Sequence, residues 1–196
     1  MNYLAHAYLS FGKPGILVGN MISDFVKGKK KFDYPKEIQE GIALHREIDR
    51  FTDTHSATKE AKEIFRPAYG LYSGAVMDVL YDHFLALDKN EFTDESLKVF
   101  TINTYETLDR FTDLFPEKFK MMFPYMKMHN WLYNYQYLQG IQKSLGGLVR
   151  RAKYLNESDT AYTLFREHYE QLKKLYDIFF PELKSMAGNF IKQSDT

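Results

Sequence analysis

The segment 41–55 has a helical pattern with three distinct faces. At about 100° per residue, one face is an apolar stripe and a second face is polar and suited to solvent. The third face carries His45, Asp49 and Asp53 at intervals of four residues, with Arg46 at its edge. A surface helix needs only an apolar and a solvent face. The third face therefore indicates either a metal or phosphate site or an ordinary surface hydrogen bond between His45 and Asp49.

Helical spacing of apolar residues recurs along the chain, and no segment has the convincing alternating pattern of a β-strand. We therefore predict an all-α fold, a single-domain helical bundle over residues 1–196. Proline lacks a backbone N–H, so we expect helices to end at Pro67 and near Phe180, with a short terminal helix starting at Pro181. The predicted helices cover residues 2–10, 16–26, 35–55, 56–65, 75–87, 94–115 and 158–180.

The composition argues against a nucleic-acid partner and against cysteine chemistry. Lys and Arg together number 26, equal to Asp and Glu, so no global charge favours a nucleic-acid partner. The chain has no cysteine, which excludes disulfides, thiolate metal sites and cysteine nucleophiles. The N-terminal residues lack the basic and long apolar regions of a signal peptide, and no apolar stretch is long enough to span a membrane. We expect a cytoplasmic protein without a membrane partner.

Several polar residues lie inside segments that are otherwise apolar. Asp24 lies in the otherwise apolar segment 16–26, and Asp78, Asp82 and His83 lie in a helix that is apolar around most of its circumference. A buried carboxylate is costly unless it is paired, hydrogen-bonded or bound to a metal. His6 also lies among apolar residues, where a packed core histidine is the alternative. Helices of a bundle can project such groups into one shared site.

These residue types point to metal-assisted hydrolysis of a phosphate ester. Carboxylates and imidazoles bind divalent ions, and such an ion can polarise a phosphoryl oxygen and lower the pKa of a water. The Arg46 guanidinium could hold a phosphate oxygen by a forked contact. The chain has no P-loop, no GxSxG motif and no HExxH motif, which argues against the enzyme classes that use them.

Four motifs in order give the chain a family resemblance, strongest over residues 1–85. The motifs are Asn2-Tyr3-Leu4-Ala5-His6, Gly19-Asn20 with Asp24-Phe25-Val26-Lys27-Gly28, Gly41-Ile42 with Leu44-His45-Arg46, Ile48-Asp49 and Phe51-Thr52-Asp53, and Asp78-Val79 with Tyr81-Asp82-His83-Phe84-Leu85. With these motifs the chain resembles the acyl carrier protein phosphodiesterase family, a divergent relative of the helical HD-type metal phosphohydrolases. The adjacent pair Asp82-His83 reverses the usual HD order.

The resemblance implies an HD-domain-like fold and a specific activity. Members hydrolyse the phosphodiester that links 4′-phosphopantetheine to a serine of holo-acyl carrier protein, which yields apo-carrier protein. They use a divalent metal, most often Mn²⁺, with Mg²⁺ and Fe²⁺ as the alternatives. The protein partner would therefore be an acyl carrier protein.

Residue roles follow as expectations from the two lines of reasoning together. We expect metal ligands at Asp24, His45, Asp82 and His83. We expect three residues to act in the reaction. Arg46 would contact the phosphate, and Asp49 would position the attacking water or complete the metal's ligand shell. His6 would protonate the leaving serine oxygen or support the ligands by a hydrogen bond. Supporting residues that orient the ligands are expected at Asn20, Asp53 and Asp78.

Acyl carrier proteins are small and acidic, so a cationic rim would raise their association rate. The candidate rim consists of Lys27, Lys29, Lys30, Lys31, Lys59, Lys62 and Arg66. Two other functions remain open from the residues. One is an HD-like hydrolase of a small nucleotide or phosphomonoester, and the other is a non-catalytic helical binding protein whose polar residues form a structural hydrogen-bond network.

Overall fold

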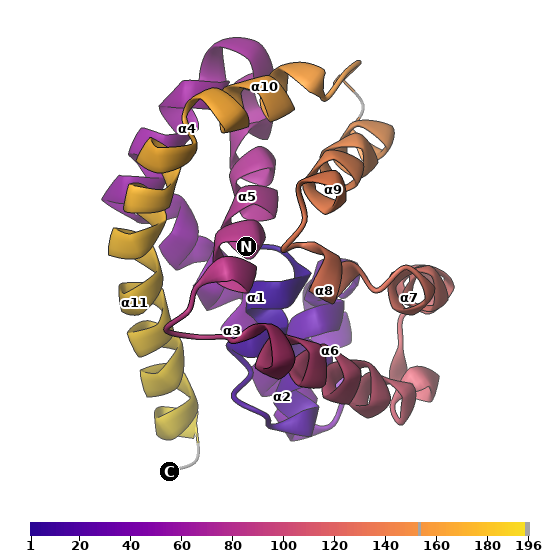
Figure 1. Cartoon of the computed structure of the whole chain (residues 1–196). Helices are drawn as coiled ribbons and strands as arrows, with labels where there is room; N and C mark the ends of the chain where they lie inside the picture. Colours follow the sequence, from indigo (N-terminus) through magenta and orange to yellow (C-terminus); the bar gives the residue numbers. More distant parts are fainter. Residues whose placement is uncertain (153, 195–196) are drawn as a thin grey trace.

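The computed structural model describes residues 1–152 and 154–194, and these residues form helices and no strand (Figure 1). The predicted all-α class is therefore confirmed; residues 153, 195 and 196 of the predicted domain lie outside the described residues. Short 3₁₀ segments include η1 (Ser23–Phe25) and η2 (Gly28–Asp33). The α-helices are α1 (Tyr3–Tyr8), α2 (Pro14–Ile22), α3 (Lys36–Thr54), α4 (Ser56–Tyr69), α5 (Ser73–Leu87), α6 (Asp94–Asp109), α7 (Glu117–Met128), α8 (Trp131–Asn134), α9 (Leu138–Arg151), α10 (Asp159–Glu167) and α11 (Tyr169–Ser194).

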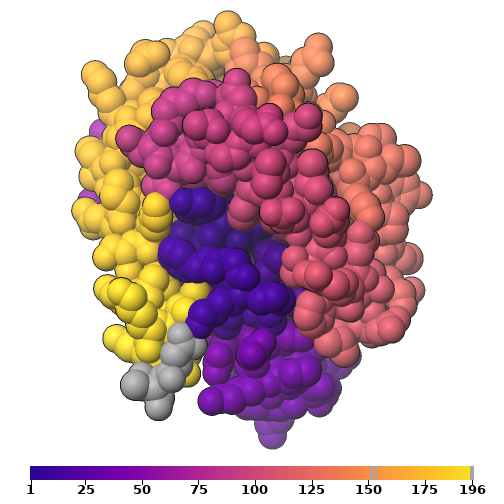
Figure 2. Space-filling view, turned by 60° about the horizontal axis from the view of Figure 1, so that its bottom comes forward, coloured from indigo at the N-terminus to yellow at the C-terminus, as the bar shows by residue number. Residues whose placement is uncertain are grey.

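Helix α5 is the centre of the bundle. Every side chain from residue 79 to residue 86 is buried, as expected for a helix that is apolar on most sides. It packs against α1, α4, α9 and α11. The long helix α11 runs along one side of the molecule (Figure 1). Figure 2 shows the N-terminal segment, in indigo, set between α11 in yellow and the middle of the chain in magenta.

Helices α2 and α3 pack closely because glycines face each other. A Cβ atom on Gly19 would lie 2.1 Å from the carbonyl oxygen of Ile38, and one on Gly41 would lie 2.2 Å from that of Ile16. Real Cβ atoms essentially never come so close to backbone atoms. The two helices therefore approach to a distance that only glycine permits. This approach brings Asn20 of α2 next to His45 of α3.

The predicted helix ends at proline were wrong. Helix α4 continues through Pro67 to Tyr69, and α11 continues through Pro181 to Ser194. Around Pro181 the side chains of Phe179, Phe180 and Leu183 are buried, so tertiary packing holds the helix where one backbone hydrogen bond is missing. The predicted helix over 158–180 instead breaks at His168, between α10 and α11.

No helix among the described residues combines the length and the apolar character needed to cross a membrane.

Candidate metal centre

Two histidines from different helices form the centre of the site. His6 lies on α1 and His45 on α3, and their rings stack with centroids 3.9 Å apart and planes inclined by 13°. Both side chains are almost fully buried. Two imidazolium ions would repel each other at this distance, so the stack requires that at least one ring is neutral.

Asn20 fixes the orientation of both rings. Its side-chain oxygen lies 2.8 Å from Nδ1 of His6, and its backbone oxygen lies 2.7 Å from Nδ1 of His45. Its amide nitrogen donates to the His6 carbonyl and to Ser10, which fixes which end of the amide is oxygen. Both partners of Nδ1 are therefore acceptors, so each Nδ1 carries the hydrogen. In the neutral form each Nε2 then keeps its lone pair.

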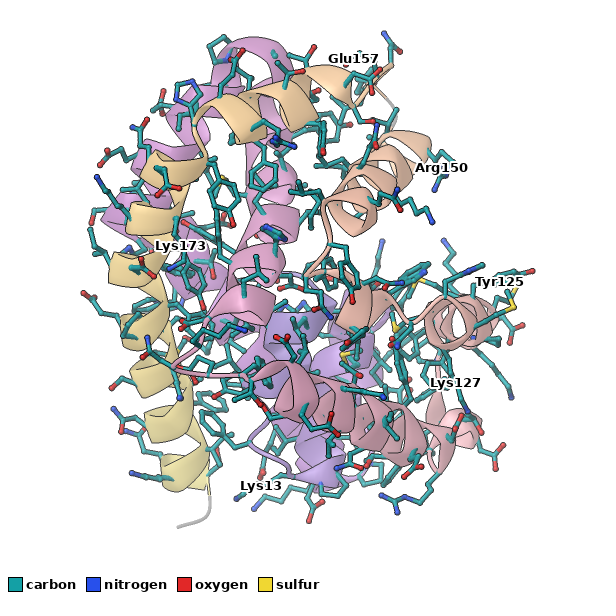
Figure 3. All side chains as sticks on the ribbon, viewed as in Figure 1. Lys13, Tyr125, Lys127, Arg150, Glu157 and Lys173 are labelled. Carbon is teal, nitrogen blue, oxygen red and sulfur yellow. The ribbon has the colours of Figure 1, made fainter. Side chains whose placement is uncertain are left out.

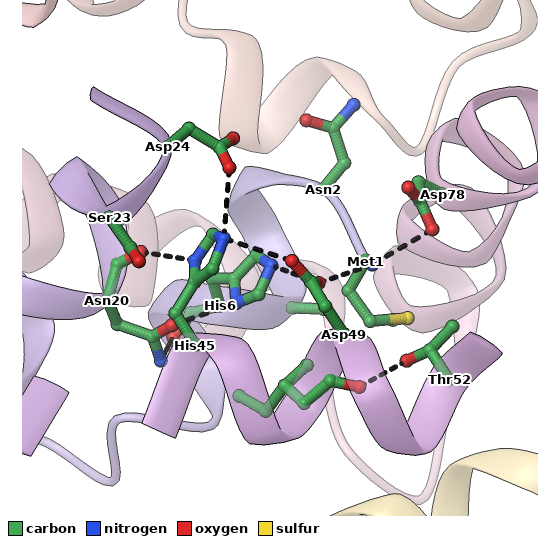
Figure 4. Close-up of polar contacts among 12 residues, drawn as sticks. Met1, Asn2, His6, Asn20, Ser23, Asp24, His45, Asp49, Thr52 and Asp78 are labelled. Atoms are coloured by element: carbon green, nitrogen blue, oxygen red, sulfur yellow. Dashed lines mark hydrogen bonds and ion pairs between the residues drawn. The ribbon is translucent and has the colours of Figure 1, made fainter. Parts of the chain in front are cut away.

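The two Nε2 atoms face carboxylates. Asp49 lies 3.1 Å from Nε2 of His45 and 3.3 Å from Nε2 of His6, and Asp24 lies 3.2 Å from Nε2 of His45 (Figure 4). A lone pair directed at a carboxylate oxygen is repulsive unless a proton or a metal ion lies between the two atoms. The arrangement therefore calls for a cation.

The residues present fit a divalent metal ion. One ligand atom from each of His6, His45 and Asp49 lies within 4.8 Å of the other two. Nε2 of His6 is buried and makes no hydrogen bond with any group that the structure describes. A metal ligand held through Nδ1 by a carbonyl oxygen is the usual arrangement for histidine. Imidazole nitrogen with carboxylate oxygen suits first-row divalent ions.

The electrostatics of the cluster agree with this geometry. Burial disfavours a charge on His45, but the carboxylates of Asp24 and Asp49 outweigh it and raise the pKa of His45 to about 9. Burial and the charge of the stacked His45 lower the pKa of His6 to about 4. Burial works against the charge of Asp49 as well, yet its contacts with both histidines hold the pKa of Asp49 far below its usual range. The carboxylates of the site therefore stabilise a positive charge placed beside the two imidazoles.

Asp24 is more exposed than its sequence context indicates. Its side chain is 66% exposed, whereas the apolar residues before it suggest burial. The hydrogen bond with His45 is the main cause that lowers the pKa of Asp24. Asp24 and the half-exposed Asp49 therefore form the solvent side of the cluster, while the two imidazoles form its buried side.

Asp82 and His83 were expected as ligands at this cluster, but the structure directs their polar atoms at other groups. The Asp82 carboxylate accepts hydrogen bonds from the backbone N–H groups of Leu4 and Ala5, at 2.7 and 3.2 Å, and so holds the start of α1. His83 points elsewhere, with Nδ1 2.7 Å from the Tyr135 carbonyl oxygen. Burial raises the pKa of Asp82 to about 7, although the hydrogen bonds from these two N–H groups act to lower it. The buried carboxylate is satisfied by backbone amides and is not among the clustered ligand atoms, unlike the position expected for it from the sequence.

The remaining predicted polar residues surround the cluster. Asp78 lies 2.9 Å from the amino group of Met1, which is also 3.3 Å from Asp49. Arg46 is exposed and donates to the Val26 carbonyl oxygen at 3.2 Å. Asp53 is on the same face of α3 as Asp49 but forms an ion pair with Lys62 instead. Asp53 therefore lies outside the ligand group.

The predicted cationic rim divides into two parts. Lys27, Lys29 and Lys30 are exposed and directly follow the segment that carries Asp24. On α4, Lys62 is paired with Asp53 and Arg66 with Glu63. Lys59 is exposed on α4, and Lys31 lies over the ring of Phe32.

Comparison with known proteins identifies the family of the chain. The family model described as acyl carrier protein phosphodiesterase matches residues 1–183. The chain belongs to the acyl carrier protein phosphodiesterase family. A protein of that name from Klebsiella pneumoniae is 33% identical over 96% of this chain and 98% of its own length. Relatives of the same name from Photorhabdus laumondii and Yersinia pestis are 30% and 32% identical. No solved structure matches the chain, so the HD-like detail of the fold stays a prediction.

Some features of this phosphodiesterase family member were visible in the sequence and some were not. The i,i+4 spacing of His45 and Asp49 already placed both on one face of α3. The stacking of His6 on His45 was not predicted, and Asn20 was expected to orient ligands without its contacts with these two rings being specified. They depend on how α1, α2 and α3 pack. The nearest sequence signal was the pair of glycines, Gly19 and Gly41, each inside a predicted helix.

Proposed function

We propose that this chain is a metal-dependent phosphodiesterase that removes 4′-phosphopantetheine from holo-acyl carrier protein and leaves the apo-carrier. The observation that carries the proposal is the pair of Nε2 atoms, on His6 and His45, directed at the Asp49 carboxylate. The family and the names of the relatives support the substrate.

The ligand set proposed here differs from the one expected from sequence. His6, His45 and Asp49 would hold the ion, and Asp82 and His83 are left out because their polar atoms are directed at other groups. Mn²⁺ is the proposed ion, with Fe²⁺ and Mg²⁺ as alternatives; two imidazoles favour the transition metals over Mg²⁺. Such an ion, when bound, supplies Lewis acidity at a phosphoryl oxygen and acidifies a water.

The exposed side of the cluster would receive the phosphate. Asp24 faces solvent next to His45 and, because its pKa is lowered, it is ionised at neutral pH and can orient a water by accepting a hydrogen bond from it. Arg46 follows His45 in the chain and uses one N–H on the Val26 carbonyl, which anchors its guanidinium and leaves other donors for a phosphate oxygen. The exposed lysines at positions 27, 29 and 30 would meet the acidic carrier.

Mass spectrometry of the carrier tests the proposal. The purified chain is mixed with holo-acyl carrier protein and Mn²⁺, with and without a chelator. We expect loss of one phosphopantetheine from the carrier, suppression by the chelator, and no loss with His45→Ala. Asp53→Asn is the matched control on the same helix face, since Asp53 pairs with Lys62 outside the cluster. It should retain activity.

An unchanged carrier mass with folded wild-type protein and added Mn²⁺ would overturn the proposed function. A small phosphodiester, bis(p-nitrophenyl) phosphate, serves as the second substrate in the same assay. Hydrolysis of that compound without action on the carrier would favour a hydrolase of small phosphate esters instead.

A further inference from the structure

A cavity of about 640 Å³ opens next to the metal centre, between the start of α1 and helices α7, α8 and α9. Asn2 lines its near end and follows Met1, whose amino group lies 3.3 Å from the Asp49 carboxylate of the cluster (Figure 4). The Asn2 carbonyl oxygen accepts a hydrogen bond from the backbone N–H of His6, so the near end of the cavity is one helical turn from that ligand. The cluster residues themselves do not line it.

The walls of the cavity suit an uncharged chain with amide groups. Tyr3 and Trp131 lie with ring centroids 6.4 Å apart, and the buried Tyr135 adds a third ring. Asn134 and Gln139 offer amide donors and acceptors, and both line the cavity. Aromatic faces with a few polar groups are typical of sites for small organic ligands. No carboxylate lines the cavity among the described residues.

The outer edge of the cavity is cationic. Lys143 and Arg150 line it from α9 and are exposed, and their spacing of seven residues places them on one face about 10 Å apart along the helix. Figure 3 shows Arg150 on α9 at the edge of the molecule. No carboxylate of the described residues forms an ion pair with either side chain, so their charge is available to an acidic partner.

We propose that this cavity holds the pantetheine arm of the carrier protein while the phosphodiester lies at the metal centre. The inference rests on the proposed function. The arm is an uncharged chain with two amide bonds, and it joins the phosphate, so a cavity next to the centre is placed to receive it. Asn2 and Tyr3 would line the path from the centre, and the aromatic rings would pack against the arm. Lys143 and Arg150 would contact the acidic carrier at the rim.

Trp131 provides a direct readout because it is the only tryptophan in the chain. The experiment titrates the metal-free full chain with D-pantetheine and follows the emission of Trp131. D-pantetheine has no phosphate, so the titration does not depend on catalysis, and its result is separable from the outcome of the carrier assay.

Two glycines of α9 give a matched pair of variants. A Cβ on Gly147, which lines the cavity, would contact only the end of the Arg150 side chain, at 3.6 Å. A Cβ on Gly146, which does not line the cavity, would contact only side-chain atoms of Arg150 and Ser158 at 3.8 and 3.9 Å. The Cβ atom of a leucine therefore meets no backbone atom of another residue at either position, and of the two positions only Gly147 lines the cavity.

We expect a saturable change of emission with the wild type and with Gly146→Leu, and binding at least about tenfold weaker with Gly147→Leu. Under Mn²⁺, Gly147→Leu should also lose about tenfold in kcat/KM on the holo-carrier but not on bis(p-nitrophenyl) phosphate. The absence of a saturable change in the wild type would overturn the proposal. Equal binding by Gly147→Leu and Gly146→Leu would overturn it as well.

Discussion

Gly19 of α2 lies directly against Gly41 of α3: a Cβ on Gly19 would be 2.8 Å from the Cα of Gly41. The contact places the backbone oxygen of Asn20 within 2.7 Å of Nδ1 of His45. The orientation of a candidate metal ligand thus depends on two residues without side chains. The glycines therefore have a role in the site as well as in the packing of the helices.

Replacing either glycine with alanine should destabilise the fold. The methyl group of Gly19→Ala or Gly41→Ala would overlap backbone atoms that cannot move independently, and overpacking of this kind costs about 1–3 kcal/mol or more. Chemical denaturation measures the free energy of unfolding. Gly188→Ala in α11 is the control, because its Cβ would contact only Phe11 at 3.7 Å. That variant should be as stable as the wild type or gain up to about 1 kcal/mol of helix propensity; equal losses in all three variants would contradict the close-packing argument.

Asn20→Ala should weaken metal binding more than it disturbs the fold around it. The change removes the acceptor for Nδ1 of His6 but keeps the backbone acceptor for His45. Loss of such an orienting partner typically costs about 10–100-fold in metal affinity. Calorimetric titration with Mn²⁺ gives the affinity. Ser10→Ala, which removes a different partner of the same amide, should leave the affinity within a few-fold of wild type.

The sequence predicted the helical class and the face of α3, because both depend on local periodicity. It predicted that Asp82 needs a partner, which was correct, but not which partner. A buried carboxylate can be satisfied by a metal or by backbone N–H groups, and the latter come from Leu4 and Ala5, far away in the chain. Helix ends at Pro67 and Pro181 were mispredicted because buried neighbours outweigh the local cost of proline.

His83 should make the fold sensitive to mild acid. Burial lowers its pKa below the unfolded value of 6.5, so the neutral form is favoured in the folded state. Its stabilising contribution is complete above that unfolded value and is lost as the pH falls through the lower folded value. Between about pH 8 and about pH 5, the free energy of unfolding should fall more for the wild type than for His83→Gln, which cannot titrate. Parallel pH profiles for the two proteins would contradict this assignment.

The exposed lysines after Asp24 should act on association with the carrier. Lys29→Glu should lower kcat/KM several-fold at low ionic strength, and the difference from wild type should shrink in salt because exposed charges are screened. Steady-state rates on holo-carrier protein at low and high salt measure this. Lys98→Glu, an equal charge change at an exposed position of α6, is the control. A similar loss in both variants would assign the effect to net charge alone.

The most direct test of the metal centre is a Mn²⁺ titration of three proteins by calorimetry. The wild type and Asp53→Asn should bind Mn²⁺ alike, because Asp53 pairs with Lys62. Asp49→Asn keeps the size of the side chain but removes the charge that faces both imidazoles, and it should bind at least about tenfold more weakly. Equal affinity in Asp49→Asn and wild type would show that His6, His45 and Asp49 do not hold the metal.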